Sequence, residues 1–416
     1  MTAIEFFNRT PLDNVVSSLT TVPDKIIFIG ENKQMKAFEG AFQTFLAKRG
    51  LEIEVDYRSV PQNDIDLLVK ELSAIVETEE DCVFDLTGGE DLALVALGMV
   101  YQKYRDTRNI QLQRFNMRSG VVTDCDRDGT VVYTGKPTLS VEELIGLHGG
   151  VIREETEEHV GTYPWELTPD FVEDVELLWS LCRDDPGRWN AQLNVMGVLQ
   201  KFVYDEDPLS ILADMSALRA ALFEADVRYT EIDDLLRFLD SYGLIEDLEN
   251  DGQRIIFAYK NDQVRHCLAK AGTVLELKVL IAVRQLTGPE GTAYYSDSMA
   301  GVFIDWDGDL HSWADNEKDT ENEVDVVLMR GMQPVFISCK NGAIEEDELY
   351  KLSTVTERFG GTYARKVLIA TYLGKKADSM GHFRQRAADM KIQFIEGVHE
   401  FTDQQFLKMV KHLVIN

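Results

Sequence analysis

An aspartate and a lysine lie close together along the chain, in a stretch whose pattern predicts a β-hairpin. In residues 322–342, two apolar runs rich in β-branched residues flank a turn that carries Arg330 and Gly331. Asp325 falls in the first run, and Lys340 follows the second. An acid on one strand and a lysine at the exit of its neighbour can meet at one point. A metal-dependent phosphodiesterase uses this arrangement, because a carboxylate holds a hard divalent cation while a lysine supports the attacking water or the phosphate.

The same alternation predicts which other side chains accompany these two. Successive side chains of a strand point to opposite faces, so Glu323 should share a face with Asp325, and Ser338 with Lys340. An ordinary half-buried hairpin with surface charges remains the alternative interpretation of this spacing.

Glu276 favours a metal-dependent site over an ordinary hairpin. It lies within an apolar segment, residues 272–284, that is long enough to form a helix packed on a sheet. A carboxylate in such a segment is costly to bury unless it is paired or coordinates a metal. A helix glutamate, a strand aspartate and a strand lysine, in this order, resemble the PD-(D/E)xK nuclease core. The resemblance implies that Glu276 and Asp325 bind a divalent metal, Mn²⁺ or Mg²⁺, and that Lys340 is the catalytic lysine.

The chain departs from that motif at one position. Two residues before the lysine, where the motif has an acid, stands Ser338. A serine hydroxyl is a poor metal ligand, although the backbone carbonyl of Cys339 can still coordinate the metal. Glu323, Glu345 and Glu346 are the candidates to supply the missing charge.

Length and composition predict several soluble domains. At 416 residues the chain is expected to form two or three domains, with boundaries predicted at 1–150, 151–268 and 269–416. No apolar run approaches the ~20 residues of a membrane helix, and the N-terminus lacks the pattern of a signal peptide. Five scattered cysteines without CxxC pairing favour a reducing cytoplasm.

The formal charge of −30 bears on any nucleic-acid substrate. Overall repulsion weakens nonspecific binding to polyanions, so binding requires a local basic surface and a divalent metal. Basic residues concentrate near the C-terminus, either as a solvated face or as a track for phosphates. These residues are Arg365, Lys366, Lys375, Lys376, Arg384 and Arg386.

In residues 1–150, apolar strands alternate with helical segments and a hairpin follows at 120–134. This pattern predicts an α/β fold with a doubly wound parallel sheet. Ligands of such sheets bind beyond the carboxyl ends of the strands. Two of these ends are suggestive, one with Gly30 and Asn32, the other with Thr87, Gly88 and Gly89. A glycine pair at a helix N-terminus favours a phosphate, although a plain structural turn explains it nearly as well.

A Rossmann-like domain with an Asp85-x-Thr87 loop after its fourth strand, joined to a PD-(D/E)xK core, resembles the CARF-domain nucleases of type III CRISPR systems. The resemblance implies a homodimer that senses a cyclic oligoadenylate, with cyclic tetra-adenylate as the first candidate. The CARF loop often continues to a basic residue where this chain has Asp91. Arg9, Lys33 or Arg118 is then left to neutralise the ligand phosphates.

Residues 151–268 begin with an acidic linker and continue as helices. A helix, a glycine turn and two short strands joined by Asp251-Gly252 predict a winged-helix-like unit at the end of this region. Winged helices often bind DNA, but four acidic residues lie along the helix: Glu231, Asp233, Asp234 and Asp240. The sequence therefore favours a structural or dimerising connector.

The resulting hypothesis is a cytoplasmic, metal-dependent endonuclease of antiviral defence, activated by a cyclic oligoadenylate bound to a homodimer. One alternative is a ligand-sensing regulator with a degenerate nuclease site. Another is a winged-helix transcription regulator. The sequence leaves open DNA or RNA as substrate, the ring size of the activator, its degradation, the role of Ser338 and the preferred metal.

Overall fold

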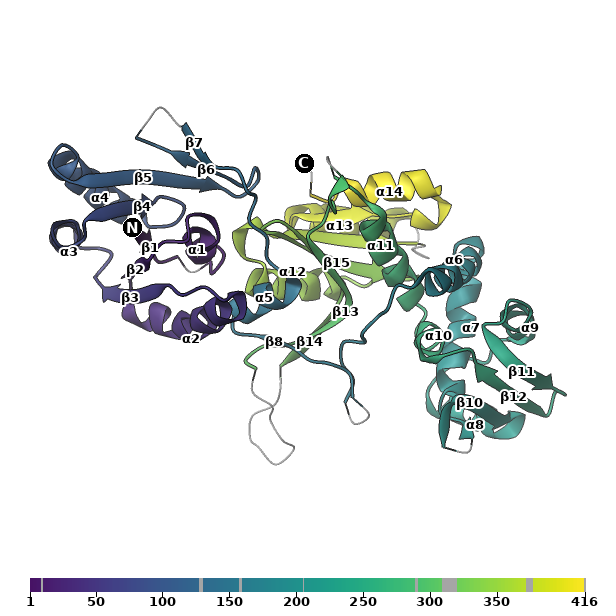
Figure 1. The fold of residues 1–416 in the computed structure, drawn as a ribbon. Coiled ribbons are helices and arrows are strands. Elements are labelled where there is room, and N and C mark those ends of the chain that lie inside the picture. The colour runs from purple at the N-terminus through teal and green to yellow at the C-terminus, as the bar shows by residue number, and fades with distance from the viewer. Residues whose placement is uncertain are drawn as a thin grey trace.

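The computed structural model describes residues 1–8, 10–126, 130–156, 159–204, 206–288, 291–308, 320–371 and 377–414. Arg9, the expected turn at 128–129, and Lys375 and Lys376 lie outside these residues. The described residues form three sheets with helices packed around them (Figure 1). None of the helices in these ranges is long and apolar enough to span a membrane.

The N-terminal sheet has the strand order β3-β2-β1-β4-β5-β6-β7. Strands β1 to β5 are parallel to one another, and β6 and β7 add an antiparallel hairpin. This confirms the predicted doubly wound sheet. The elements are β1 Thr2–Phe6, η1 Asp13–Val15, α1 Val16–Thr20, β2 Lys25–Gly30, α2 Asn32–Arg49, β3 Glu54–Ser59, α3 Ile65–Thr78, β4 Asp81–Asp85, α4 Asp91–Tyr104, β5 Asn109–Asn116, β6 Val121–Asp124 and β7 Thr130–Tyr133.

Helices cover both faces of this sheet because alternate strand residues point to opposite sides. Phe28 packs with Phe38 and Phe42 of α2 on one face, whereas Ile27 packs with α3 and α4 on the other. The parallel strands all end at the same edge, so the loops after β2 and β4 flank the loop after the central strand β1.

The middle region forms a small sheet of order β11-β12-β10-β9 with its own helices. The predicted helix, turn and strand pair are present, but β9 and β10 were not predicted. In Figure 1 this unit lies at the end of the molecule far from the N-terminal sheet, with the C-terminal sheet between them. Its elements are α6 Pro169–Asp184, α7 Pro186–Leu199, β9 Val203–Tyr204, β10 Asp207–Asp214, α8 Met215–Glu224, α9 Asp233–Ser241, β11 Ile245–Asn250, β12 Arg254–Tyr259 and α10 Asp262–Cys267.

The C-terminal sheet has the order β17-β16-β15-β14-β13-β8. Helices α11 and α14 pack on one face with Val326 and Leu328, and α5, α12 and α13 pack on the other with Val327. The elements are α5 Val141–Leu147, β8 Val151–Ile152, α11 Thr273–Gln285, β13 Asp297–Asp305, β14 Glu321–Arg330, β15 Gln333–Lys340, α12 Asp347–Phe359, η3 Gly361–Tyr363, β16 Arg365–Ala370, α13 Ala377–Asp389, β17 Ile392–Ile395, η4 Val398–Glu400 and α14 Asp403–Lys411.

The N-terminal and C-terminal sheets are joined by apolar packing. One continuous hydrophobic cluster contains residues of α2, α5 and α12, together with the inner strands of both sheets. Strand β8, residues 151–152, belongs to the C-terminal sheet although it directly follows the N-terminal region. The domain boundaries at 150 and 268 remain predictions.

Candidate functional site

Asp325 lies where β14 and β15 separate. The two strands pair from Arg330↔Gln333 to Val326↔Ile337, and the pairing stops there. Asp325 Oδ2 fills the gap: it accepts hydrogen bonds from Ser338 Oγ at 3.1 Å and from the Cys339 backbone N–H at 2.6 Å. The hairpin therefore brings Asp325 and Ser338 together, a contact that was not predicted.

The strands do not alternate strictly at this point. Ala300 and Val326 pack on one face of the sheet, whereas Val302 and Val324 pack on the other. The change of face occurs at Gly301 and Asp325, and Gly301 has a φ of +60°, which a residue without Cβ adopts easily. Alternation alone therefore does not fix the direction of Asp325, whose carboxylate lies toward β15.

Lys340 lies between two carboxylates. Its Nζ is 3.5 Å from Asp325 Oδ2 and 3.1 Å from Glu348 Oε2, in the first turn of α12. Burial alone would lower the pKa of Lys340, but the charges of Asp325 and Glu348 raise it above its ordinary value. Burial would raise the pKa of Glu348, but Lys340 and Lys351 hold it below its ordinary value. Both side chains of this ion pair are therefore charged.

Glu276 reaches the same place from the first turn of α11. Burial raises its pKa well above the ordinary value, and the charges of Asp325 and Glu323 raise it further. Burial also raises the pKa of Asp325. Two acids that repel each other in a poorly solvated site are stabilised by a cation between them. Glu276, Asp325, Cys339, Lys340 and Glu348 are called the hydrolytic site below.

The donors of this site are of the type that Mg²⁺ and Mn²⁺ prefer. All three hydrogen bonds to Asp325 fall on Oδ2, and Oδ1 has no partner among the described residues. Since the Cys339 N–H points at Asp325, its carbonyl faces the same neighbouring strand, beyond the end of the ladder. Within the described residues, no three His, Cys, Asp or Glu side chains converge closely enough to hold a metal ion. The donor set fits a hard cation, but Lys340 lies between two of its carboxylates.

The acids considered as substitutes for the motif's missing carboxylate do not contact Lys340. Glu323 pairs with Lys270 at 3.4 Å, Glu346 pairs with Arg386 at 3.2 Å, and Glu345 is exposed. Glu348 was not predicted. Its one sequence signal is an acid at the start of the helix that follows the lysine strand.

The described residues of the predicted basic track are mostly neutralised. Lys366 pairs with Glu357, Arg384 with Glu396, and Arg386 with Glu346. A free run of positive charge for phosphates is therefore not formed by these three side chains.

The two predicted sensor loops meet at the end of β1. A Cβ at Gly30 would stand 2.7 Å from Phe7 Cβ, and a Cβ at Gly88 would stand 2.9 Å from the Phe6 carbonyl oxygen. Both positions require glycine because the backbone of one loop approaches the neighbouring strand. Asn32 is exposed at the start of α2. Residues 30–34 and 86–91 are called the sensor loops below.

Thr87 is engaged within its own loop. Its hydroxyl donates to Asp85 and accepts the backbone N–H of Phe115 at 3.0 Å. By contrast, the backbone N–H groups of Gly88 and Gly89 have no acceptor in the part of the chain that the structure describes. They precede α4, so these donors and the helix N-terminus form an arrangement that favours an anion.

Buried acids lie beneath the sensor loops. Burial raises the pKa of Asp85 to about 6. Burial, followed by the charge of Asp85, raises the pKa of Asp13 to about 7, and burial raises the pKa of Glu5 well above its ordinary value. Asn8 Nδ2 donates to Asp13 Oδ2 at 2.8 Å and fixes the loop after β1. Asp85 was noted in the sequence as part of its loop, whereas Glu5 and Asp13 were not predicted.

A cavity of about 700 Å³ separates the end of β1 from α12. Thr10 and Gln34 line it from the N-terminal sheet, His148 from the segment after α5, and Arg358 and Gly361 from the end of α12. Helix α12 therefore has one end near the sensor loops and carries Glu348 of the hydrolytic site at the other.

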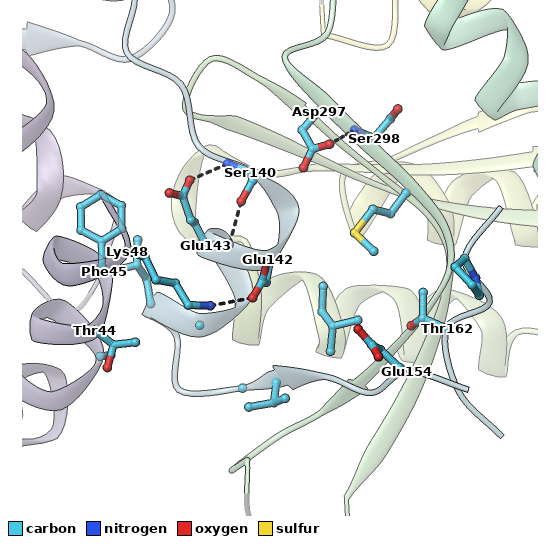
Figure 2. Close-up of a pocket in the computed structure, with 18 of the residues that line it drawn as sticks. Thr44, Phe45, Lys48, Ser140, Glu142, Glu143, Glu154, Thr162, Asp297 and Ser298 are labelled. Atoms are coloured by element: carbon cyan, nitrogen blue, oxygen red, sulfur yellow. Dashed lines mark hydrogen bonds and ion pairs between the residues drawn. The ribbon is translucent and has the colours of Figure 1, made fainter. Parts of the chain in front are cut away.

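A larger cavity of about 890 Å³ lies between α2, α5, β8 and β13 (Figure 2). Lys48 pairs with Glu142 across it at 2.6 Å, and Ser140 caps α5 through Glu143. Asp297 accepts the Val141 backbone N–H at 2.7 Å. The acidic lining of this cavity disfavours a phosphate ligand.

Comparisons with known proteins found one matching family model and several solved structures of similar fold. Residues 282–411 match the family model described as Card1-like, endonuclease domain. The matched range includes Asp325, Lys340 and Glu348 and begins after Glu276. No curated protein sequence matches the chain.

The whole chain has the fold of two solved structures. Protein VC1899 from Vibrio cholerae matches with a TM-score of 0.75 and 18% identity, over 100% of this chain and 99% of that one. Can2 from Sulfobacillus thermosulfidooxidans, solved in complex with cyclic tetra-adenylate, matches with a TM-score of 0.65 and 17% identity, over 100% and 98%. These matches confirm the predicted fold, a CARF-like unit combined with a PD-(D/E)xK-like nuclease unit.

Proposed function

We propose that this chain is a metal-dependent endonuclease of type III CRISPR defence that a cyclic oligoadenylate activates. The observation that carries the proposal is the contact between Asp325 and Lys340 at the end of the β14–β15 pairing, with the buried Glu276 near enough for the charge of Asp325 to raise its pKa. Asp325 and Lys340 lie within the region similar to the Card1-like endonuclease domain.

The groups of the hydrolytic site have different proposed roles. Asp325, Glu276 and the Cys339 carbonyl would hold Mg²⁺ or Mn²⁺, which when bound supplies Lewis acidity toward a phosphodiester. The Ser338 and Cys339 donors both bond to Oδ2 and so fix the orientation of the Asp325 carboxylate. Lys340 is charged, and its ammonium stabilises the negative charge that develops on the phosphate during attack.

The sensor loops bind the activator in this proposal. Gly88 and Gly89 offer backbone N–H groups that no described residue accepts, just before α4, and Thr87 holds that loop through Asp85 and Phe115. Gly30 and Asn32 border the same edge, and Arg9 remains a proposed phosphate contact. Cyclic tetra-adenylate is the proposed ring, because Can2, which shares the fold, was solved with it.

The proposed assembly is a homodimer, in which a two-fold axis places two copies of the sensor loops around one symmetric ring. Helix α12 would carry the signal, since it extends from the cavity beside Thr10 to Glu348. The proposed substrate is DNA, RNA or both.

A sensor without nuclease activity is the second candidate. The serine at position 338 and the neutralisation of Lys340 by Asp325 and Glu348 favour it. The winged-helix regulator has weaker support, because Asp233 and Asp234 open α9 with negative charge.

A cleavage assay decides among these functions. Plasmid DNA, single-stranded DNA and single-stranded RNA are incubated with the full chain, Mn²⁺ or Mg²⁺, and cyclic oligoadenylates of several ring sizes. We expect cleavage that requires both the metal and one ring size, and that chelation of the metal abolishes. Activator binding without cleavage under every condition would replace the enzyme with the sensor.

A further inference from the structure

The motif position that lacks an acid on β15 is matched by an acid on the neighbouring helix. Ser338 contributes only a hydroxyl, which donates to Asp325. Glu348 of α12 contacts Lys340, the lysine of the same strand, at 3.1 Å. We propose that Glu348 replaces the acid that the motif has at the position of Ser338, and that it binds the divalent cation together with Asp325.

The packing of α12 against the C-terminal sheet holds Glu348 in its position. The next residue, Leu349, and Leu352 one turn later are buried against the C-terminal sheet. The Glu348 backbone N–H also bonds to the Glu345 carbonyl at 3.2 Å. Because the first turn of α12 is held in this way, the Glu348 carboxylate is directed toward the end of β15.

The ammonium group of Lys340 indicates where positive charge is stable in this site. A single Nζ lies within 3.5 Å of Asp325 Oδ2 and 3.1 Å of Glu348 Oε2. A hard divalent cation interacts more strongly with two carboxylates than a single ammonium does. When the cation takes this place, the long Lys340 side chain is released to contact the phosphate.

The other acids near the strand end do not offer the same contact. Glu323 and Glu346 are paired with Lys270 and Arg386. Glu348 also pairs with Lys351 through Oε1, but its Oε2 is the oxygen directed at Lys340. This inference rests on the proposed nuclease function, whose catalytic groups it completes.

Calorimetric titration of Mn²⁺ into the full chain tests the role of Glu348 without any cleavage. Glu348→Gln should lower Mn²⁺ affinity at least tenfold, as the loss of one charged ligand implies. Glu357→Gln is the matched control. Glu357 lies on the same helix as Glu348 but away from the site, and it also pairs with a lysine, Lys366 of β16. Its substitution should leave Mn²⁺ affinity unchanged.

Moving the acid back to the strand gives a positive test. Ser338→Glu combined with Glu348→Gln should recover most of the lost Mn²⁺ affinity, because the motif's own position then carries the carboxylate. Glu348→Asp, which keeps the charge on a shorter stem, should bind Mn²⁺ more tightly than Glu348→Gln. These two variants also answer the concern that Glu348→Gln simply misfolds.

The Lys340→Ala background shows whether Glu348 binds the metal itself or acts only by positioning Lys340. In that background Glu348→Gln should still weaken Mn²⁺ binding. If it has no further effect there, or if Glu348→Gln alone binds Mn²⁺ as the wild type does, the inference is overturned. The nuclease function fails separately, when the wild type binds Mn²⁺ through Asp325 yet cleaves nothing with any activator.

Discussion

Thr10, at the edge of the sensor loops, touches Gly361 in the turn that ends α12. A Cβ added at Gly361 would stand only 2.7 Å from Thr10 Cγ2, and Gly361 has a φ of +62°. This is a direct contact between the N-terminal and C-terminal units at the helix that carries Glu348. A substitution that disturbs this contact should reduce cleavage without reducing activator binding.

Gly361→Ala should reduce activated cleavage while leaving activator affinity close to wild type. The alanine methyl collides with Thr10 Cγ2, and its positive φ costs about 1 kcal/mol more than glycine. Thr10→Ser removes that methyl and keeps the hydroxyl, so the double variant should recover part of the loss. Activated cleavage rates, and calorimetry with the activator, measure this for the two single variants and the double variant. Strictly additive effects would show that the contact does not couple the two units.

Asp13 should make the N-terminal sheet less stable as the pH rises. Its pKa is raised from 3.8 to about 7 in the folded chain. Because the folded state keeps the proton longer, the stabilisation present below pH 4 is lost as the pH rises through 7. Asp13→Asn keeps the shape without the charge, so at pH 8 it should be more stable than the wild type by up to about 4 kcal/mol.

Hydrogen exchange of residues 2–6 and 81–85, followed from pH 5 to pH 8, reports this local stability. Asp106→Asn, which changes an exposed carboxyl beside Arg105, is the control and should not alter the slope. A wild-type slope in Asp13→Asn would show that another group governs the pH dependence.

Thr87→Val should lower both the stability of the sensor loop at residues 86–91 and its affinity for the activator. The substitution keeps the shape but removes a hydroxyl that donates to Asp85 and accepts the Phe115 N–H. Loss of bonds in this partly buried place costs about 1–3 kcal/mol, part of it as stability and part as activator affinity. Calorimetry with cyclic tetra-adenylate and thermal unfolding measure the two parts, with Thr44→Val on α2 as the control. Unchanged binding would remove Thr87 from the proposed site.

The free chain should already be a dimer, because a symmetric ring needs both sensor loops to be enclosed. Light scattering at micromolar concentration should give about twice the chain mass of 47.2 kDa. A chain that stays monomeric with the activator bound would contradict the symmetric model.

The sequence predicted those features that depend on local pattern. Alternating apolar strands and helices were enough for the doubly wound sheet, and the hairpin of β14 and β15 followed from its apolar runs. Glu276 was identified because a charge in an apolar helix requires a partner. These are short-range signals, which one chain carries without any knowledge of its tertiary contacts.

Features that depend on long-range packing were not accessible in this way. Glu348 meets Lys340 only because α12 packs against β15, and nothing in its local sequence distinguishes it from Glu345 or Glu346. Asp13 is buried near Asp85, at the end of β4, which is far from it in the sequence. The change of face at Asp325 depends on Gly301 of another strand.

Substitutions at the end of the hairpin test the hydrolytic site most directly. Asp325→Asn removes the charge that would anchor a hard cation, and Lys340→Ala removes the charge that faces the phosphate. Both should abolish activated cleavage, a loss of at least 100-fold, roughly 3 kcal/mol of transition-state stabilisation. Both should keep activator affinity, since neither residue lies at the sensor loops. Reduced activator affinity in either variant would mean that the fold had been damaged.

Ser338→Ala is the sharper test, because the nuclease motif and this chain differ there. Ser338 Oγ is one of three donors to Asp325 Oδ2, beside the Cys339 N–H at 2.6 Å and Lys340 at 3.5 Å. Two donors remain after the substitution, so its cost is about 1 kcal/mol and activated cleavage should fall no more than about tenfold. Steady-state cleavage rates at saturating activator and metal measure this. Loss of all cleavage in Ser338→Ala would show that the hydroxyl itself takes part in the reaction.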